Sequence, residues 1–161
     1  MGRTSALERF LRYVAIDTRA DDSSSACPST AGQRDLATLL VAELHALGIA
    51  DAAVDDNGYV VATIPASPGF EQRPAIGFIA HVDTSPEMSG TNVRPIVHER
   101  YDGRDIVLPD DPSAILRPSD DPNLAARIGD DIVTASGTTL LGADDKAGVA
   151  AIMAAAELLV K

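Results

Sequence analysis

A run of apolar residues from 74 to 82 sets strong limits on how this chain folds. Its sequence is PAIGFIAHV, and its apolar side chains fall on both faces of an extended strand. Strands that are apolar on both faces are typical of the middle of a parallel sheet, because helices cover both sides of such a sheet. The run therefore predicts a central, parallel strand over residues 74–82.

Three other segments carry apolar residues at helical spacing. The first helix is predicted over residues 5–17, and the second from Thr30 to Leu47. Both begin with the capping-box pattern, a hydroxyl residue followed three positions later by Glu or Gln. Gly48 follows the second helix where a C-terminal cap belongs. The third helix is predicted over residues 146–160.

Two hairpins are predicted from turn residues between short apolar runs. Residues 52–54 and 59–64 lie on either side of an Asn-Gly pair, which is the strongest short hairpin signal. Residues 131–135 and 138–141 flank a Ser-Gly pair in the same way.

Residues 84–129 are rich in Pro, Asp and Gly, and only 96–97 and 106–108 have the pattern of strands. A loop of this length without structure is uncommon, so short strands or a functional excursion are expected here. Helices and strands alternate along the chain as a whole. The predicted fold class is therefore α/β.

Charge and cysteine content narrow the function and the compartment. The net charge of −11 argues against nucleic acid and anionic membranes as partners, because both require a basic surface. The single cysteine, Cys27, has no partner for an internal disulfide. Neither a secretory signal nor a membrane-spanning run is expected. These features predict a soluble protein of the reducing cytoplasm.

His81 and Asp83 follow directly after the predicted central strand. Residues two apart in a strand lie on one face, and ligands gather at the carboxyl ends of strands in open α/β sheets. A histidine that binds a metal through one ring nitrogen usually donates the other N–H to a carboxylate. Asp83 suits that role or could bind metal itself. The alternative is a histidine at a strand end next to a solvated aspartate.

A second polar feature is the pair Asp144-Asp145 at the start of the last helix, within LLGADDKAG. A helix N-terminus favours one carboxylate, which explains Asp145 better than it explains the pair. Two adjoining carboxylates repel unless a cation offsets them, so Lys146 would help and a metal would help more. His81 and Asp144 are both ligand types that suit zinc, although 63 residues separate them.

The segments AHVDTSPEMSGTNV and TTLLGADDKAG resemble the two signature segments of a family of two-zinc exopeptidases, amidohydrolases and deacylases. The continuation D-T-S-P after the histidine is similar to the tripeptide aminopeptidase branch of that family. The resemblance also takes in LERFLRYVAIDT and PSTAGQ and covers essentially the whole chain.

The resemblance implies a fold, a cofactor and roles for three residues. The fold would be a three-layer catalytic domain with a mixed, mostly parallel sheet, and the cofactor two Zn²⁺ ions. His81 would bind one zinc, Asp144 would bridge both, and Asp83 would be the catalytic residue that orients the site. A carboxylate can bridge two metals because its two oxygens can each bind one.

The family's general base, its remaining ligands and its smaller inserted domain have no counterpart in these 161 residues. His45 and His98 are not predicted to be ligands. The chain is therefore expected to be the N-terminal part of a catalytic domain, spanning residues 1–161 of it. The expected function of the complete enzyme is release of the N-terminal residue from a small peptide substrate, a tripeptide. The alternatives are another two-zinc dipeptidase, carboxypeptidase or amino-acid deacylase, a metal-independent binding module, or an inactive truncated chain.

Overall fold

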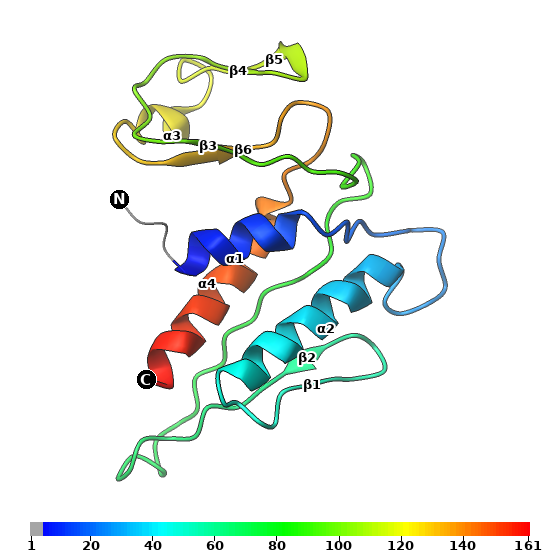
Figure 1. The fold of residues 1–161 in the computed structure, drawn as a ribbon, viewed down its shortest axis with the longest axis vertical. Coiled ribbons are helices and arrows are strands. Elements are labelled where there is room, and N and C mark those ends of the chain that lie inside the picture. Colours follow the sequence, from blue (N-terminus) through cyan, green and yellow to red (C-terminus); the bar gives the residue numbers. More distant parts are fainter. Residues whose placement is uncertain (1–4) are drawn as a thin grey trace.

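The computed structural model describes residues 5–161 and combines helices with short strands (Figure 1). The helices in this range are α1 (Ser5–Val14), α2 (Ala31–Ala46), α3 (Pro122–Ala125) and α4 (Ala143–Leu159). The strands are β1 (Ala53–Val54), β2 (Val60–Val61), β3 (Ile96–His98), β4 (Ile106–Leu108), β5 (Asp111–Leu116) and β6 (Ile132–Thr134). The predicted mixture of α and β structure is therefore confirmed.

The three long helices form the main core. Figure 1 shows α1 crossing α4, with α2 beside them and the β1–β2 hairpin against α2. Their apolar faces meet in one cluster of buried side chains, which includes Tyr13, Val14, Leu36, Leu40, Val149 and Met153. The three long helices form where the apolar periodicity predicted them, because each apolar stripe has another helix to pack against.

The ends of these helices differ in detail from the prediction. α1 ends at Val14, three residues before the predicted end. The predicted capping box at α2 is wrong, because the Thr30 hydroxyl donates to the carbonyl of Arg19 and makes no cap bond. The side-chain amide of Gln33 instead donates to the Thr18 carbonyl and to the Ser29 hydroxyl. Gly48 follows the helix with a positive φ of 87°, as a C-terminal glycine should.

Within residues 5–161, each strand pairs with one other strand, and the three pairs are antiparallel. The predicted hairpin around the Asn-Gly pair is confirmed, with Ala53 opposite Val61. The second predicted hairpin is wrong, because β6 pairs with β3 and not with residues 138–141. The pairing with β3 places the imidazole of His98 3.0 Å from the Thr134 hydroxyl, a contact that the turn signal alone could not reveal.

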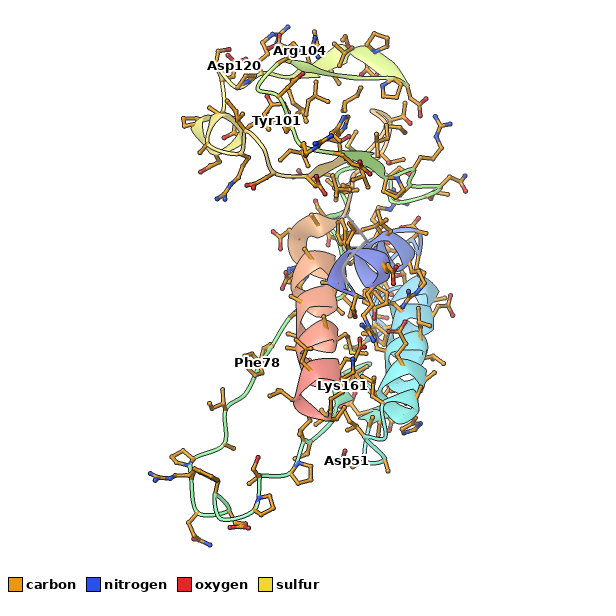
Figure 2. All side chains as sticks on the ribbon, turned by 60° about the vertical axis from the view of Figure 1, so that its left-hand side comes forward. Asp51, Phe78, Tyr101, Arg104, Asp120 and Lys161 are labelled. Atoms are coloured by element: carbon orange, nitrogen blue, oxygen red, sulfur yellow. The ribbon has the colours of Figure 1, made fainter. Side chains whose placement is uncertain are left out.

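The predicted central parallel strand is not found. Residues 74–82 run extended along the helices, but no strand of the described range pairs with them. Ile76 is 82% exposed and Ile79 is 96% exposed. Figure 2 shows Phe78 on this segment, standing clear of α4. The apolar pattern predicted a buried strand, but a strand also needs neighbouring strands, and the described range provides none for this segment. The mostly parallel sheet is therefore absent from residues 5–161.

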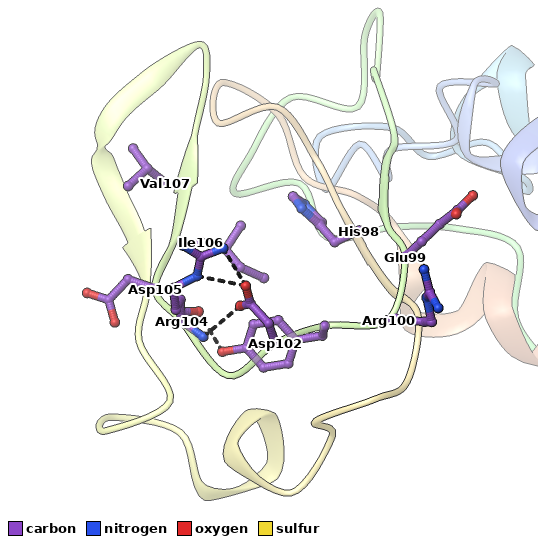
Figure 3. Close-up of a pocket in the computed structure, with 9 residues that line it drawn as sticks. His98, Glu99, Arg100, Asp102, Arg104, Asp105, Ile106 and Val107 are labelled. Atoms are coloured by element: carbon purple, nitrogen blue, oxygen red, sulfur yellow. Dashed lines mark hydrogen bonds and ion pairs between the residues drawn. The ribbon is translucent and has the colours of Figure 1, made fainter.

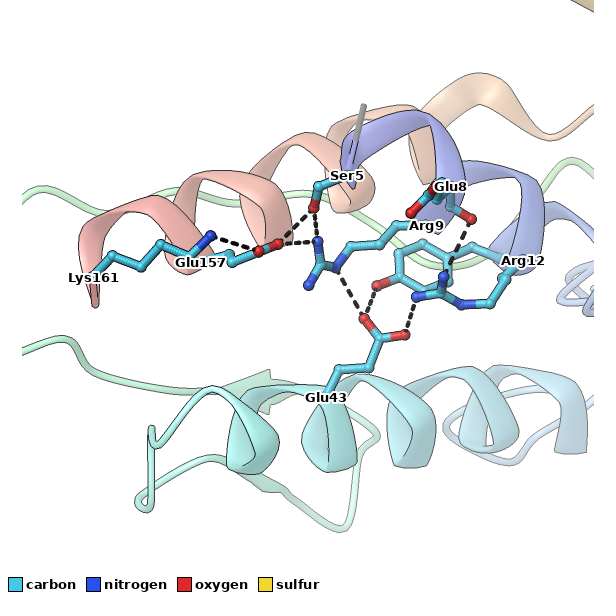
Figure 4. A network of polar contacts seen from close by, with 8 residues as sticks. Ser5, Glu8, Arg9, Arg12, Glu43, Glu157 and Lys161 are labelled. Carbon is cyan, nitrogen blue, oxygen red and sulfur yellow. Dashed lines mark hydrogen bonds and ion pairs between the residues drawn. The ribbon is translucent and has the colours of Figure 1, made fainter. Parts of the chain in front are cut away.

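A network of ion pairs and hydrogen bonds joins the three long helices (Figure 4). Arg9 of α1 contacts Glu43 of α2 at 3.1 Å and Glu157 of α4 at 2.8 Å. The Tyr13 hydroxyl donates to Glu43 at 2.7 Å. Hydrogen bonds from Ser5, Arg9 and Lys161 lower the pKa of Glu157 to about 2. The network therefore depends on Glu43 and Glu157 being ionised.

This dependence predicts a loss of stability in acid. The folded-state pKa of Glu157 lies below its ordinary value of 4.5, so its contribution is present above pH 4.5 and is lost as the pH falls from 4.5 towards 2. Urea denaturation between pH 7 and pH 3 should show the folded chain losing stability in that window. Glu157→Gln should lose less between pH 4.5 and pH 3 than the parent. Glu8→Gln, which changes an exposed glutamate of α1, should follow the parent. An identical pH profile for Glu157→Gln and the parent would contradict the prediction.

None of the helices within residues 5–161 combines the length and the apolar character that crossing a bilayer requires.

Candidate metal centre

His81 lies between two carboxylates, one on each side of its imidazole ring. Its Nε2 is 3.0 Å from Oδ1 of Asp144. Its Nδ1 is 3.0 Å from the backbone carbonyl oxygen of Asp83 and 3.3 Å from the carboxylate oxygen Oδ1 of Asp83. The structure thus brings together all three residues that the sequence singled out, although Asp144 is 63 positions away from His81.

The segment that carries His81 is held in place by residues that follow α1. Thr18 is fully buried and donates its hydroxyl to the carbonyl of Val82 at 2.6 Å. Thr84 donates its N–H to the Thr18 carbonyl at 3.2 Å and accepts from the Ala20 N–H at 2.9 Å. The two backbone bonds form a short parallel bridge, and together with the Thr18 hydroxyl they fix the backbone on the C-terminal side of His81.

Asp144 is presented by an irregular turn at the start of α4. Gly142 precedes it with a φ of 77°, a left-handed conformation that favours glycine. Asp144 and Asp145 have non-helical backbone angles, and the peptide bond between them is cis. The Asp145 carboxylate accepts a hydrogen bond from the N–H of Gly148 at 3.0 Å, as an N-terminal cap does. Capping therefore explains Asp145 but not Asp144.

The Asp144 carboxylate extends into solvent beside His81. The Asp144 side chain is 96% exposed and the His81 side chain is 52% exposed. Partial burial alone would lower the pKa of His81, but its hydrogen bonds with Asp144 and Asp83 outweigh it and raise the pKa above 6.5. The two carboxylates therefore favour a positive charge on the His81 ring.

The donor atoms suit a divalent metal ion. One ring nitrogen of His81 is oriented by Asp83, which leaves Nε2 facing the Asp144 carboxylate, and imidazole with carboxylate is a donor set that zinc prefers. Within residues 5–161, however, no group of three or more His, Cys, Asp or Glu side chains is arranged to hold a metal. The chain thus fits a metal with two donors of the right kind, fewer than a closed site needs.

The other two histidines, His45 and His98, contact other groups. The His45 Nε2 is 2.9 Å from the carbonyl of Ala52, and His98 contacts Thr134. A hollow of about 470 Å³ lies beside His98, in the region of β3 and β4 (Figure 3). Two of its charged residues, Asp102 and Arg104, already pair with each other. The hollow contains none of the predicted site residues.

Lys146 is the residue near the site that the sequence did not explain correctly. The sequence offered it as one group that could help to offset the charge of the Asp144-Asp145 pair, with a metal as the stronger one. Instead, its ammonium donates to the carbonyl of Ile16 at 2.7 Å and faces the charge of Asp17. Burial lowers the pKa of Lys146 to about 8. The signal in the sequence was a lysine within the apolar stretch of the last helix, two positions after the candidate ligand.

An oriented imidazole opposite a second carboxylate makes His81 and Asp144 candidates for binding a divalent metal ion. No family model matches the chain. Its sequence is, however, 54% identical over 155 residues to peptidase T of Geobacillus thermodenitrificans and 53% identical over 156 residues to peptidase T of Alkaliphilus oremlandii. It is 49% identical over 154 residues to peptidase T of Listeria monocytogenes.

These alignments take in 96% of this chain but only 37–38% of each relative. The chain thus spans less than two fifths of the length of these relatives. The resemblance to the tripeptide aminopeptidase branch that the sequence motifs indicated is confirmed by this similarity to peptidase T, which covers nearly the whole chain.

Proposed function

We propose that this chain is the N-terminal part of the catalytic domain of a tripeptide aminopeptidase. The observation that carries the proposal is the placement of His81 Nε2 3.0 Å from Asp144 Oδ1, with Asp83 on the other ring nitrogen. The similarity to peptidase T supports the reaction class. The substrate is a small peptide with a free N-terminal amino group, and the product is its first amino acid.

Each of the three residues has a proposed role in a two-zinc centre. His81 would hold one zinc through Nε2, and Asp83 holds the imidazole ring in the orientation that this requires. Asp144 would hold both ions, since a carboxylate has two oxygens and the Asp144 side chain is 96% exposed. Zinc at this position would polarise the scissile carbonyl and lower the pKa of water to about 7.

The rest of the centre and of the sheet come from the remainder of the longer protein. The general base and the further ligands lie outside residues 1–161, in this proposal. Residues 74–82 form a central strand of a three-layer domain once other strands pair with them and helices cover both faces, which accounts for the exposed Ile76, Phe78 and Ile79. The exposed, unpaired Cys27 agrees with a reducing cytoplasm.

Activity of the longer protein tests the proposal. After removal of metal by a chelator and return of zinc, it should hydrolyse unmodified tripeptides and release the first amino acid. It should not hydrolyse the same tripeptides with an acetylated N-terminus, because an aminopeptidase binds the free amino group. Preference for dipeptides, for release of the C-terminal residue, or for acylated amino acids would show that one of the related reactions is correct instead.

The 161-residue chain alone should hydrolyse tripeptides negligibly and bind zinc weakly, because it provides only two donor side chains. Isothermal titration with Zn²⁺ and a tripeptide assay measure both properties. Rapid zinc-dependent hydrolysis by the purified chain would contradict the proposal that essential groups lie elsewhere.

A further inference from the structure

Lys146 is the only charged residue within residues 5–161 that is buried, with 2% of its surface exposed. Its ammonium donates to the carbonyl oxygen of Ile16 at 2.7 Å, and the negative charge of Asp17 favours the ammonium form. A buried ammonium is costly unless it is paired and hydrogen-bonded. An apolar side chain of similar length, such as methionine, would fill the same space without that cost. The packing of α4 therefore does not by itself account for a lysine here.

The carbonyl that Lys146 contacts belongs to a segment that also holds the His81 side of the site. We call residues 16–20 the bridging segment. Two residues after Ile16, the hydroxyl of Thr18 donates to the carbonyl of Val82, and Thr84 bonds to the backbone of Thr18 and Ala20. The bridging segment is thus bonded to the chain on the C-terminal side of His81.

The bridging segment is itself firmly seated. The start of α2 packs directly on it, since the carbonyl of Asp17 leaves no room for a side chain at Gly32. The Asp17 carboxylate accepts a hydrogen bond from the Thr91 hydroxyl at 2.6 Å. A displacement of the bridging segment would therefore disturb several neighbours, which makes it a stable reference point.

The stem of Lys146 also lies close to the turn that carries Asp144. A Cβ at Gly142 would be 3.6 Å from both Cδ and Nζ of Lys146 and 3.2 Å from the methyl group of Thr84. The lysine stem, the Gly142 turn and Thr84 therefore lie against one another. Lys146 contacts the Asp144 turn through its stem and the bridging segment through its ammonium.

We propose that Lys146 is a positioning residue that sets the place of Asp144 relative to His81. It does so through two successive hydrogen bonds. The first runs from the Lys146 ammonium to the Ile16 carbonyl, and the second from the Thr18 hydroxyl to the Val82 carbonyl. The inference rests on the proposed function, because it gives these two side chains the task of sharing metal ions. Lys146 itself has no contact with the reacting groups in this arrangement.

Lys146→Met in the longer protein tests the proposal, because methionine keeps the length of the stem and removes the ammonium. Zinc affinity of the metal-free protein, measured by competition with a chromophoric chelator, should fall by about 10- to 100-fold, the usual cost of losing a residue that orients a ligand. The kcat for a tripeptide should fall, with KM little changed. Thr18→Val removes the other link and should weaken zinc binding by about 2- to 10-fold, as loss of one hydrogen bond would.

Thr38→Val is the matched control for Thr18→Val, since the Thr38 hydroxyl bonds only to the Arg34 carbonyl within the exposed side of α2. It should leave zinc affinity and kcat unchanged. A lower melting temperature for Lys146→Met, with zinc affinity and kcat as in the parent, would show a merely structural role and overturn the proposal. If Lys146→Met does not fold, parent-like zinc affinity in Thr18→Val overturns it. Failure of the parent itself to bind zinc or cleave tripeptides would instead overturn the proposed function.

Discussion

Replacing His81 with alanine in the longer protein is expected to abolish hydrolysis of tripeptides and leave the fold intact. The ring is 52% exposed, so its removal leaves no cavity in the core and no buried group without a partner. The variant does lose the nitrogen that faces Asp144 at 3.0 Å. Loss of a residue that only orients a ligand costs up to about 100-fold. Because His81 is the proposed ligand itself, zinc affinity and kcat/KM should both fall by more than that.

Two further variants show whether the effect comes from the site. Asp83→Asn keeps the size of the orienting side chain but weakens its hold on Nδ1 of His81, so it should cost about 10- to 100-fold in activity. His45→Ala removes an exposed histidine near the C-terminus of α2, outside the candidate site, and should behave as the parent in the assay. Melting curves and circular dichroism would show that all three variants are folded. Parent-like kcat/KM in His81→Ala would remove His81 from the active site.

The sequence predicted the helices because their information is local. The stripe that includes Leu36, Leu40 and Leu44 appears in the chain as a period, and in the structure the same residues are buried in the core. Strand pairing depends on distant segments. The turn at Ser136-Gly137 indicated a hairpin, yet β6 pairs with β3, which lies more than thirty residues earlier. Nothing in the local pattern distinguishes the two partners.

More of the candidate site than of the sheet could be predicted, because its three side chains lie in short, recognisable sequence segments. The sequence identified His81, Asp83 and Asp144 from residue type and position, and the structure places the three side by side. The sequence did not identify Thr18 or the carbonyl of Ile16. A backbone carbonyl has no signature in the sequence, and a threonine near the end of a helix has many possible partners. The residues that hold the site together were therefore visible only in three dimensions.

Leu36→Ala should cause a large loss of stability in the 161-residue chain. Leu36 is fully buried in the core cluster, where α2 packs with the other long helices (Figure 1). Removing its side chain loses the free energy of burial and leaves a cavity, and such substitutions cost about 2–5 kcal/mol. A typical domain is stable by only about 5–15 kcal/mol. This chain also exposes Ile76, Phe78 and Ile79, so it is expected to lie at or below the lower end of that range.

Urea denaturation followed by far-UV circular dichroism measures the effect. The urea concentration at the midpoint should be much lower for Leu36→Ala, or the variant should show no transition because it is already unfolded without urea. Leu158→Ala makes the same chemical change at a side chain that is 72% exposed, and it should shift the free energy of unfolding by no more than about 0.5 kcal/mol. The comparison isolates burial, because both leucines lie in helices and lose the same atoms. Equal midpoints for the two variants would mean that the α1–α2–α4 core is not what stabilises this chain, and the anchoring of the bridging segment on that core would need another explanation.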